Sequence, residues 1–129
     1  MRVIAAIVAI LGLGVLVMGV LFITQAASAD TEISGQIAPL PAAGVDAKYD
    51  EVAAKQAQVK AAEEPKIQAG QAAPSDMYNY LSVQKTSLGL AKANLATANF
   101  VRMSGMVTAV LGLAVVLAGI VLFKNQASA

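Results

Sequence analysis

The acidic side chains are the first candidates for chemistry, because they occur in three close pairs. The pairs are Asp30/Glu32, Asp50/Glu51 and Glu63/Glu64. Two carboxyl groups can act as general acid and general base when an apolar environment raises the pKa of one of them. None of the three pairs lies in an apolar stretch. We interpret the latter two as part of a solvated helix face rather than as a catalytic or calcium site.

The rest of the composition offers no other reactive groups. The chain contains no histidine and no cysteine, which excludes Ser–His and Cys–His nucleophiles and the corresponding metal ligands. Gly12-x-Gly14 lacks the third glycine of a dinucleotide-binding loop and lies in an apolar run. The formal net charge of +1 indicates no nucleic-acid partner. We expect no catalytic, metal-binding or cofactor-binding residues, and a protein that is not an enzyme.

Two apolar blocks, residues 3–23 and 103–123, dominate the chain. Each has 21 residues, which as a helix span roughly 31 Å, the thickness of a bilayer's hydrocarbon core. The second block contains only Ser104 and Thr108 as polar side chains. The pattern predicts an all-α membrane protein with transmembrane helices at 1–24 and 103–123 and a short tail at 124–129.

The first block has an alternative interpretation as a secretory signal peptide. Ala27-Ser28-Ala29 before Asp30 resembles a small-x-small cleavage site. The apolar core of 21 residues exceeds the ~7–15 residues that are usual for a signal peptide. A retained helix is therefore favoured, and cleavage after Ala29, which would leave a single-span protein with its N-terminus outside, stays open.

Both blocks carry a strip of small residues on one helical face. Close approach of two helices in lipid depends on such strips, because van der Waals contact replaces the hydrophobic effect there. An antiparallel pair of helices would match Ala5 with Gly119, Gly12 with Gly112, and Gly19 with Gly105. The sequence does not decide whether the two strips belong to one chain or to neighbours. The strip residues are Ala5, Ala9, Gly12, Gly19, Gly105, Ala109, Gly112 and Gly119.

The residues between the blocks fall into a linker and two helices. Glycine and proline at 25–44 predict an extended linker with a short β-like stretch at 32–37. A helix follows from residue 45 with Asp46 as its N-cap, and Pro65 is expected to stop or kink it. Gly70 and Pro74 complete a turn near 65–75, and Ser75 caps the next helix. No proline follows Pro74, so that helix should continue into the second span.

Apolar residues recur every seven positions in both predicted helices, which is typical of a coiled-coil-like seam. An antiparallel pairing of Val45 with Leu95 and Val52 with Leu88 has its midpoint at Gly70, inside the predicted turn. We therefore expect residues 45–102 to form a helical hairpin, the stalk. An alanine-rich hairpin is marginal alone, so partner helices are implied. The seam residues are Val45, Val52, Val59, Leu81, Leu88 and Leu95.

Met77, Tyr78 and Tyr80 lie near the predicted tip of the stalk. We expect them to cover the end of the hairpin core, and the alternative is an anchor for a partner protein.

Charges near the blocks predict the topology. Arg2 and Lys124 flank the outer ends of the two blocks, and Asp30 and Glu32 lie on the loop side. The positive-inside tendency then places both termini in the cytoplasm and the stalk outside the cell membrane, although Lys92 and Arg102 favour the opposite.

The expected function is structural. The leading hypothesis is an assembly or accessory subunit of a membrane complex or lattice, whose partners are the bilayer, other membrane subunits or further copies of itself. One alternative is a signal-cleaved, C-terminally anchored ectodomain that acts as a binding or adhesion module. A small pore-forming protein is a third, although the absence of charge within both spans gives it no support.

Overall fold

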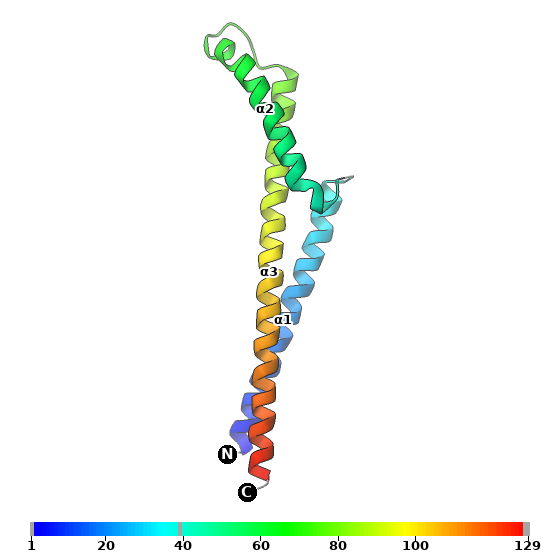
Figure 1. The fold of residues 1–129 in the computed structure, drawn as a ribbon, viewed down its shortest axis with the longest axis vertical. Helices are drawn as coiled ribbons and strands as arrows, with labels where there is room; N and C mark the ends of the chain where they lie inside the picture. The colour runs from blue at the N-terminus through cyan, green and yellow to red at the C-terminus, as the bar shows by residue number, and fades with distance from the viewer. Residues whose placement is uncertain (1, 39, 128–129) are drawn as a thin grey trace. The chain divides into compact units, whose positions relative to one another are not determined.

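The computed structural model describes residues 2–38 and 40–127, and within them the chain is all-helical. These residues contain three α-helices, one short 3₁₀ turn and no strand: α1 (Arg2–Gln36), η1 (Ala42–Gly44), α2 (Val45–Gln68) and α3 (Asp76–Ala127) (Figure 1). The prediction of an all-α chain is confirmed. Two of the helices, α1 and α3, are long and apolar enough to cross a membrane.

The chain divides into two compact units. Unit 1 contains Met1–Ala29 and Thr97–Ala129, and unit 2 contains Asp30–Ala96. Unit 1 thus combines most of α1 with the second half of α3. Unit 2 combines the end of α1 with η1, α2 and the first part of α3.

The predicted extended linker at 25–44 is wrong for its first twelve residues, because α1 continues to Gln36 and includes most of the β-like stretch. Hydroxyl groups at the start of this stretch and just before it bond to the helix itself: Thr24 Oγ1 donates to the Leu21 carbonyl (2.9 Å) and Ser28 Oγ to the Thr24 carbonyl (3.1 Å). Ile33 is buried in a cluster with Val45 and Ala91. This packing keeps a segment of weak local propensity helical.

The end of α2 lies beyond Pro65, so the stop that was one of the two effects predicted for this proline does not occur. The helix continues through Pro65 to Gln68, and Gly70, at φ +70°, ends it. Gly70 N–H donates to the Ile67 carbonyl (3.0 Å) and Gln71 N–H to the Lys66 carbonyl (2.9 Å). These two bonds form a Schellman motif, which satisfies carbonyls at the helix end and requires a residue at positive φ.

The starts of α2 and α3 are built differently. Gly44 precedes α2 without a side-chain cap, and Asp46 lies within the first turn, so its predicted role as N-cap is wrong. Ser75 caps α3 as predicted, since its Oγ accepts a hydrogen bond from Tyr78 N–H (3.1 Å). From Asp76 the helix is uninterrupted to Ala127, as the absence of proline after Pro74 predicts.

Candidate helix-packing and partner-contact sites

In unit 1, glycines bring the backbones of α1 and α3 into direct contact. A Cβ atom added to Gly12 would lie 3.0 Å from the Gly112 carbonyl oxygen and 2.6 Å from Val116 N. A Cβ added to Gly112 would lie 2.9 Å from the Gly12 carbonyl oxygen. The two residues therefore face each other reciprocally, and neither position has room for a side chain.

Gly19 and Gly105 repeat this arrangement. A Cβ at Gly19 would lie 2.7 Å from the Gly105 carbonyl oxygen, and one at Gly105 would lie 2.8 Å from that of Gly19. In each pair the two backbones approach as closely as at helix interfaces where weak Cα–H···O bonds recur. Such contacts bring two helices together without needing water exclusion.

The third predicted pair is shifted by one turn. The sequence predicts Ala5 opposite Gly119, but Ala9 lies nearest to Gly119, and a Cβ there would lie 2.9 Å from the Ala9 Cβ. Ala5 is itself buried, with 1% of its surface exposed. Ala109 of α3 also belongs to this contact, because its backbone nitrogen lies against Gly19. The strip residues of both helices thus meet within one chain.

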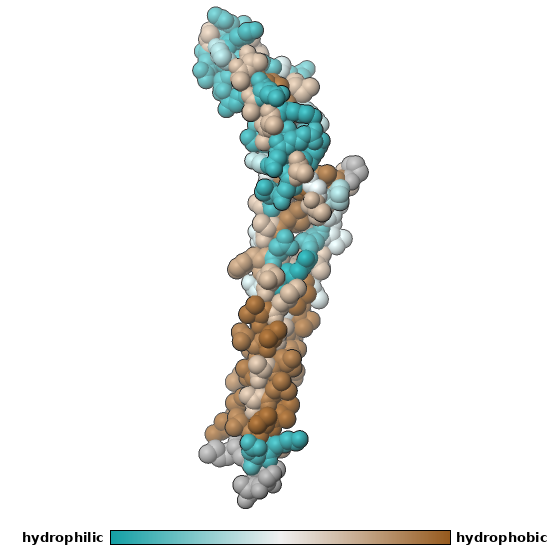
Figure 2. Space-filling view, in the orientation of Figure 1, coloured by the Kyte–Doolittle hydropathy of each residue, from teal (hydrophilic) through white to brown (hydrophobic). Residues whose placement is uncertain are grey.

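The other faces of unit 1 are apolar and exposed. Ile10 of α1 is 68% exposed, and Val110 of α3 is 66% exposed. Figure 2 shows the resulting nearly continuous hydrophobic surface over the paired α1 and α3 segments of unit 1. A helix in the core of a soluble protein would instead bury its large side chains. This surface, together with the backbone contacts, is the principal structural feature of the unit.

In unit 2, the predicted seam residues form two buried clusters. Val45 packs with Ile33 and Ala91, with Leu95 beside them. Val52 packs with Leu81 and Leu88, with Val59 at the edge. Val45 and Leu95 thus belong to one cluster and Val52 and Leu88 to the other, while the antiparallel register itself stays a prediction. The sequence does not indicate the contribution of Ile33, because the linker prediction makes its segment extended.

The three residues predicted at the stalk tip do not cover the core together. Met77 is 56% exposed and Tyr80 is 60% exposed, whereas Tyr78 is partly buried. The interpretation of Met77 and Tyr80 as core-capping residues is therefore wrong. Both side chains remain accessible on α3, in line with Val83 and Leu90, which are also mostly exposed.

A carboxylate from α2 completes the cap of α3. Glu63 Oε2 accepts a hydrogen bond from Ser75 N–H (3.0 Å), and Glu63 Oε1 accepts one from the Ser75 hydroxyl (2.7 Å). These bonds lower the pKa of Glu63 below its ordinary value. In a capping box, the acid that binds the N-cap N–H lies three residues later. Tyr78 occupies that position here, and Glu63 supplies the acid from the preceding helix.

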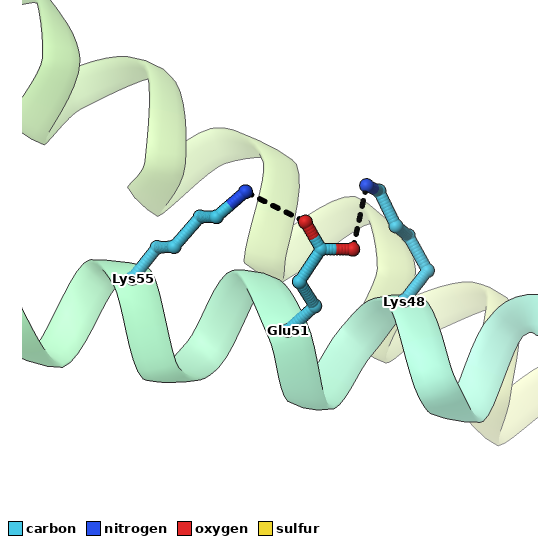
Figure 3. Close-up of polar contacts among 3 residues, drawn as sticks. All are labelled: Lys48, Glu51 and Lys55. Atoms are coloured by element: carbon cyan, nitrogen blue, oxygen red, sulfur yellow. Dashed lines mark hydrogen bonds and ion pairs between the residues drawn. The ribbon is translucent and has the colours of Figure 1, made fainter.

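Two lysines share one carboxylate on the surface of α2. Lys48 Nζ lies 2.8 Å from Glu51 Oε2, and Lys55 Nζ lies 2.6 Å from Glu51 Oε1 (Figure 3). Hydrogen bonds from Lys48 and Lys55, in that order of effect, lower the pKa of Glu51 to about 2. The three side chains carry two positive charges and one negative charge, so the group keeps a surplus of positive charge at neutral pH.

An ion pair and an aromatic ring connect α2 to α3. Lys92 Nζ lies 3.0 Å from Asp46 Oδ1 and 5.4 Å from the centre of the Tyr49 ring. The hydrogen bond to Asp46 raises the pKa of Lys92. Gly89 makes room for the ring, since a Cβ there would lie 3.3 Å from Tyr49 Cε2. The predicted solvated face of α2 therefore also contributes specific contacts to unit 2.

Among residues 2–38 and 40–127, no three acidic, histidine or cysteine side chains gather in a way that would hold a metal ion. Comparison with models of known protein families, with curated proteins and with solved structures found no match. Functional inference for this chain therefore rests on its own geometry.

Proposed function

We propose that this protein is a non-enzymatic integral membrane protein that acts as a structural, assembly or accessory subunit of a membrane complex. The observation that carries the proposal is unit 1: two long apolar helices whose backbones meet at Gly12/Gly112 and Gly19/Gly105, with large apolar side chains exposed on their other faces. A bilayer is the environment in which such exposed surface is stable.

We propose that α1 is retained rather than cleaved. Ala26 is 2% exposed, and the helix continues without interruption past the candidate cleavage site at Ala29. Cleavage would remove Gly12 and Gly19 and leave Gly105 and Gly112 without the backbone they contact. N-terminal sequencing of protein from native membranes tests this step, because a cleaved chain would begin at Asp30.

We propose that α2 and the first part of α3 form the antiparallel stalk outside the membrane. The buried clusters and the hydrogen bond from Gln56 Nε2 to Ser82 Oγ (3.1 Å) support this pairing. A Val52→Cys/Leu88→Cys variant should form an intramolecular disulfide on oxidation, since the pair would lie within the ~7 Å Cα separation that a disulfide spans. A Val52→Cys/Val83→Cys variant is the control, because Val83 is exposed. Cross-linking only between chains would contradict the hairpin.

We propose that partner subunits contact the exposed apolar side chains of α3 in unit 2, namely Tyr80, Val83 and Leu90. Charged residues crowd α2, whereas this stretch of α3 carries few, and aromatic and aliphatic anchors set in uncharged surface are typical of interface cores.

Co-purification in mild detergent tests the subunit role. Tagged protein should recover a partner in fixed stoichiometry, or an untagged co-expressed copy if the chain assembles with itself. A Val83→Ser/Leu90→Ser variant should lose that partner, and a Lys60→Gln/Lys66→Gln variant on α2 should keep it. If both variants still recover the partner, the assigned contact surface is wrong. If the wild-type protein is recovered without any other subunit or a second copy, the subunit role is wrong.

A further inference from the structure

Unit 2 contains an open pocket of about 500 Å³ beside the buried cluster of Val52, Leu81 and Leu88. It lies between three parts of unit 2: residues 37–41, which follow α1, the first turn of α2, and residues 84–88 of α3. Its volume is within the ~300–1,000 Å³ that is usual for small-molecule sites. The apolar part of its lining includes Ile37, Leu40, Pro41 and Leu88.

The polar part of the lining contains Lys48 and Gln84. Lys48 shares the Glu51 carboxylate with Lys55, and Lys48 is the member of this group that lines the pocket. Both oxygens of Glu51 are already occupied, one by Lys48 and one by Lys55. Neutralisation of Lys48 is therefore incomplete, and an anion placed beside it would gain a charge-assisted hydrogen bond.

We propose that this cavity binds an amphipathic anion, with an apolar chain against Ile37, Leu40 and Leu88 and a carboxylate or phosphate group at Lys48. An apolar pocket with a small number of polar groups at one edge is the usual form of a site that fixes the orientation of a ligand. The ligand class is an acyl chain with a single anionic head, which a free fatty acid and a lysophospholipid both supply.

Site-directed photolabelling of the full-length protein tests the proposal. The protein is placed in phosphatidylcholine nanodiscs and irradiated with a diazirine analogue of dodecanoate, and adducts are mapped by mass spectrometry. We expect labelling of peptides that contain 37–41 or 84–88. Excess dodecanoate or lysophosphatidic acid should suppress it, and the stronger competitor identifies the head group. Dodecanol, which has the same chain without the charge, should suppress it at least tenfold less effectively.

Three variants distinguish a binding site from general apolar labelling. Lys48→Gln should lower labelling of these peptides about tenfold, the equivalent of one charge-assisted hydrogen bond of ~1.4 kcal/mol. Glu51→Gln should raise it, because removal of the shared carboxylate leaves Lys48 unpaired. Lys60→Gln is the matched control, since Lys60 pairs with Glu64 on the same helix and does not line the cavity.

The opposite signs expected for Lys48→Gln and Glu51→Gln exclude a trivial loss of structure. Equal labelling in all variants, equal competition by dodecanol, or adducts confined to residues 1–29 and 97–129 would overturn the proposal. Because the label is mapped to unit 2, failure here leaves the subunit role untouched, and failure of the co-purification test leaves this site untouched.

Discussion

The glycines of this chain fall into groups that differ in what surrounds each Cα atom. At Gly12 and Gly112 the opposite helix backbone occupies the place of a side chain, whereas Gly14 has nothing within 4 Å of that place. At Gly70 the surroundings are open and the backbone angle is the constraint, with φ at +70°. The same residue type is thus needed for close approach in unit 1 and for a turn in unit 2.

Substitution of Gly12 should separate α1 from α3. Gly12→Leu places a side chain against Val116 N and the Gly112 carbonyl, and overpacking of this kind costs about 1–3 kcal/mol. We expect a lower midpoint of thermal denaturation in mild detergent. Gly14→Leu adds the same side chain two residues away in open space and should leave the midpoint unchanged. Equal behaviour of the two variants would show that the backbone contact does not stabilise unit 1.

Substitution of Gly70 should loosen the end of α2. Gly70→Ala forces an alanine into the left-handed region, which costs roughly 1–2 kcal/mol. Hydrogen exchange of the amides at Gly70 and Gln71, which close the Schellman motif, should accelerate about fivefold or more. Gly35→Ala is the control, because Gly35 lies in α1 with open space around it. Unchanged exchange in Gly70→Ala would mean that the turn has another conformation.

At the scale of the elements, the start of α3 depends on a residue of α2. The Glu63 carboxylate accepts both the N–H and the hydroxyl of Ser75, and the Ser75 Oγ accepts Tyr78 N–H. Negative charge at a helix N-terminus is also favoured by the helix dipole. Since the folded state lowers the pKa of Glu63, ionisation of this carboxyl group and capping of α3 stabilise each other.

The pH dependence of this cap follows from the sign of the shift. A carboxyl group with a lowered pKa contributes stability above its ordinary value of 4.5, and that stability is lost as the pH falls below it toward the folded-state pKa. The amide resonances of Ser75 and Tyr78 in detergent micelles should therefore shift as the pH falls below 4.5. In the Glu63→Gln variant these two resonances should stay constant over the same pH range. In the Glu64→Gln variant, the control, they should shift as they do in the wild type. Persistence of the titration in Glu63→Gln would assign it to another group.

Helix extents were harder to predict than helix existence. The seven-residue spacing of Val45, Val52, Leu81 and Leu88 survives in the buried clusters, because periodicity reports a face directly. The helical state of 25–36 depends on Ile33 reaching Val45 and Ala91, and local composition carries no sign of that contact.

The helix ends and caps also depend partly on nearby residues, which the sequence shows, and partly on contacts with distant residues, which it does not. The sequence predicts a stop or kink at Pro65 and a turn completed by Gly70 and Pro74, and the helix ends at the positive φ of Gly70. The cap from Glu63 had only a faint signal, a serine N-cap without an acid three residues later. In unit 1 the glycine strips were visible in the sequence, and the one-turn shift of Gly119 to Ala9 was not. Small residues mark the facing sides of the helices and here match Gly12 with Gly112 and Gly19 with Gly105, but they do not show which residue lies nearest to Gly119.

At the scale of the whole molecule, the proposed function requires a different source of stability for each of the two units. Unit 1 exposes large apolar side chains, which a bilayer stabilises and water does not. Unit 2 carries nearly all the charged residues, including Glu51 and the two lysines that pair with it (Figure 3), and its buried clusters are small. A unit with so little core is marginally stable alone, which is why partner contacts at Val83 and Leu90 would contribute substantially to its stability.

The last prediction concerns membrane topology, that is, on which side of the membrane the termini and the turn between α2 and α3 lie. The stretch between the apolar blocks has seven basic and eight acidic residues, whereas Arg2 and Lys124 flank the outer ends of the blocks. The positive-inside tendency then places both termini in the cytoplasm and Gln71 outside. Gln71→Cys should react with a membrane-impermeant maleimide in intact cells, because Gln71 is exposed in the turn between α2 and α3. Asn125→Cys, exposed near the end of α3, should react only after permeabilisation. The chain has no native cysteine, so each signal comes from one site. Labelling of Asn125→Cys alone in intact cells would invert the topology, and labelling of both sites would mean that α3 does not cross the membrane.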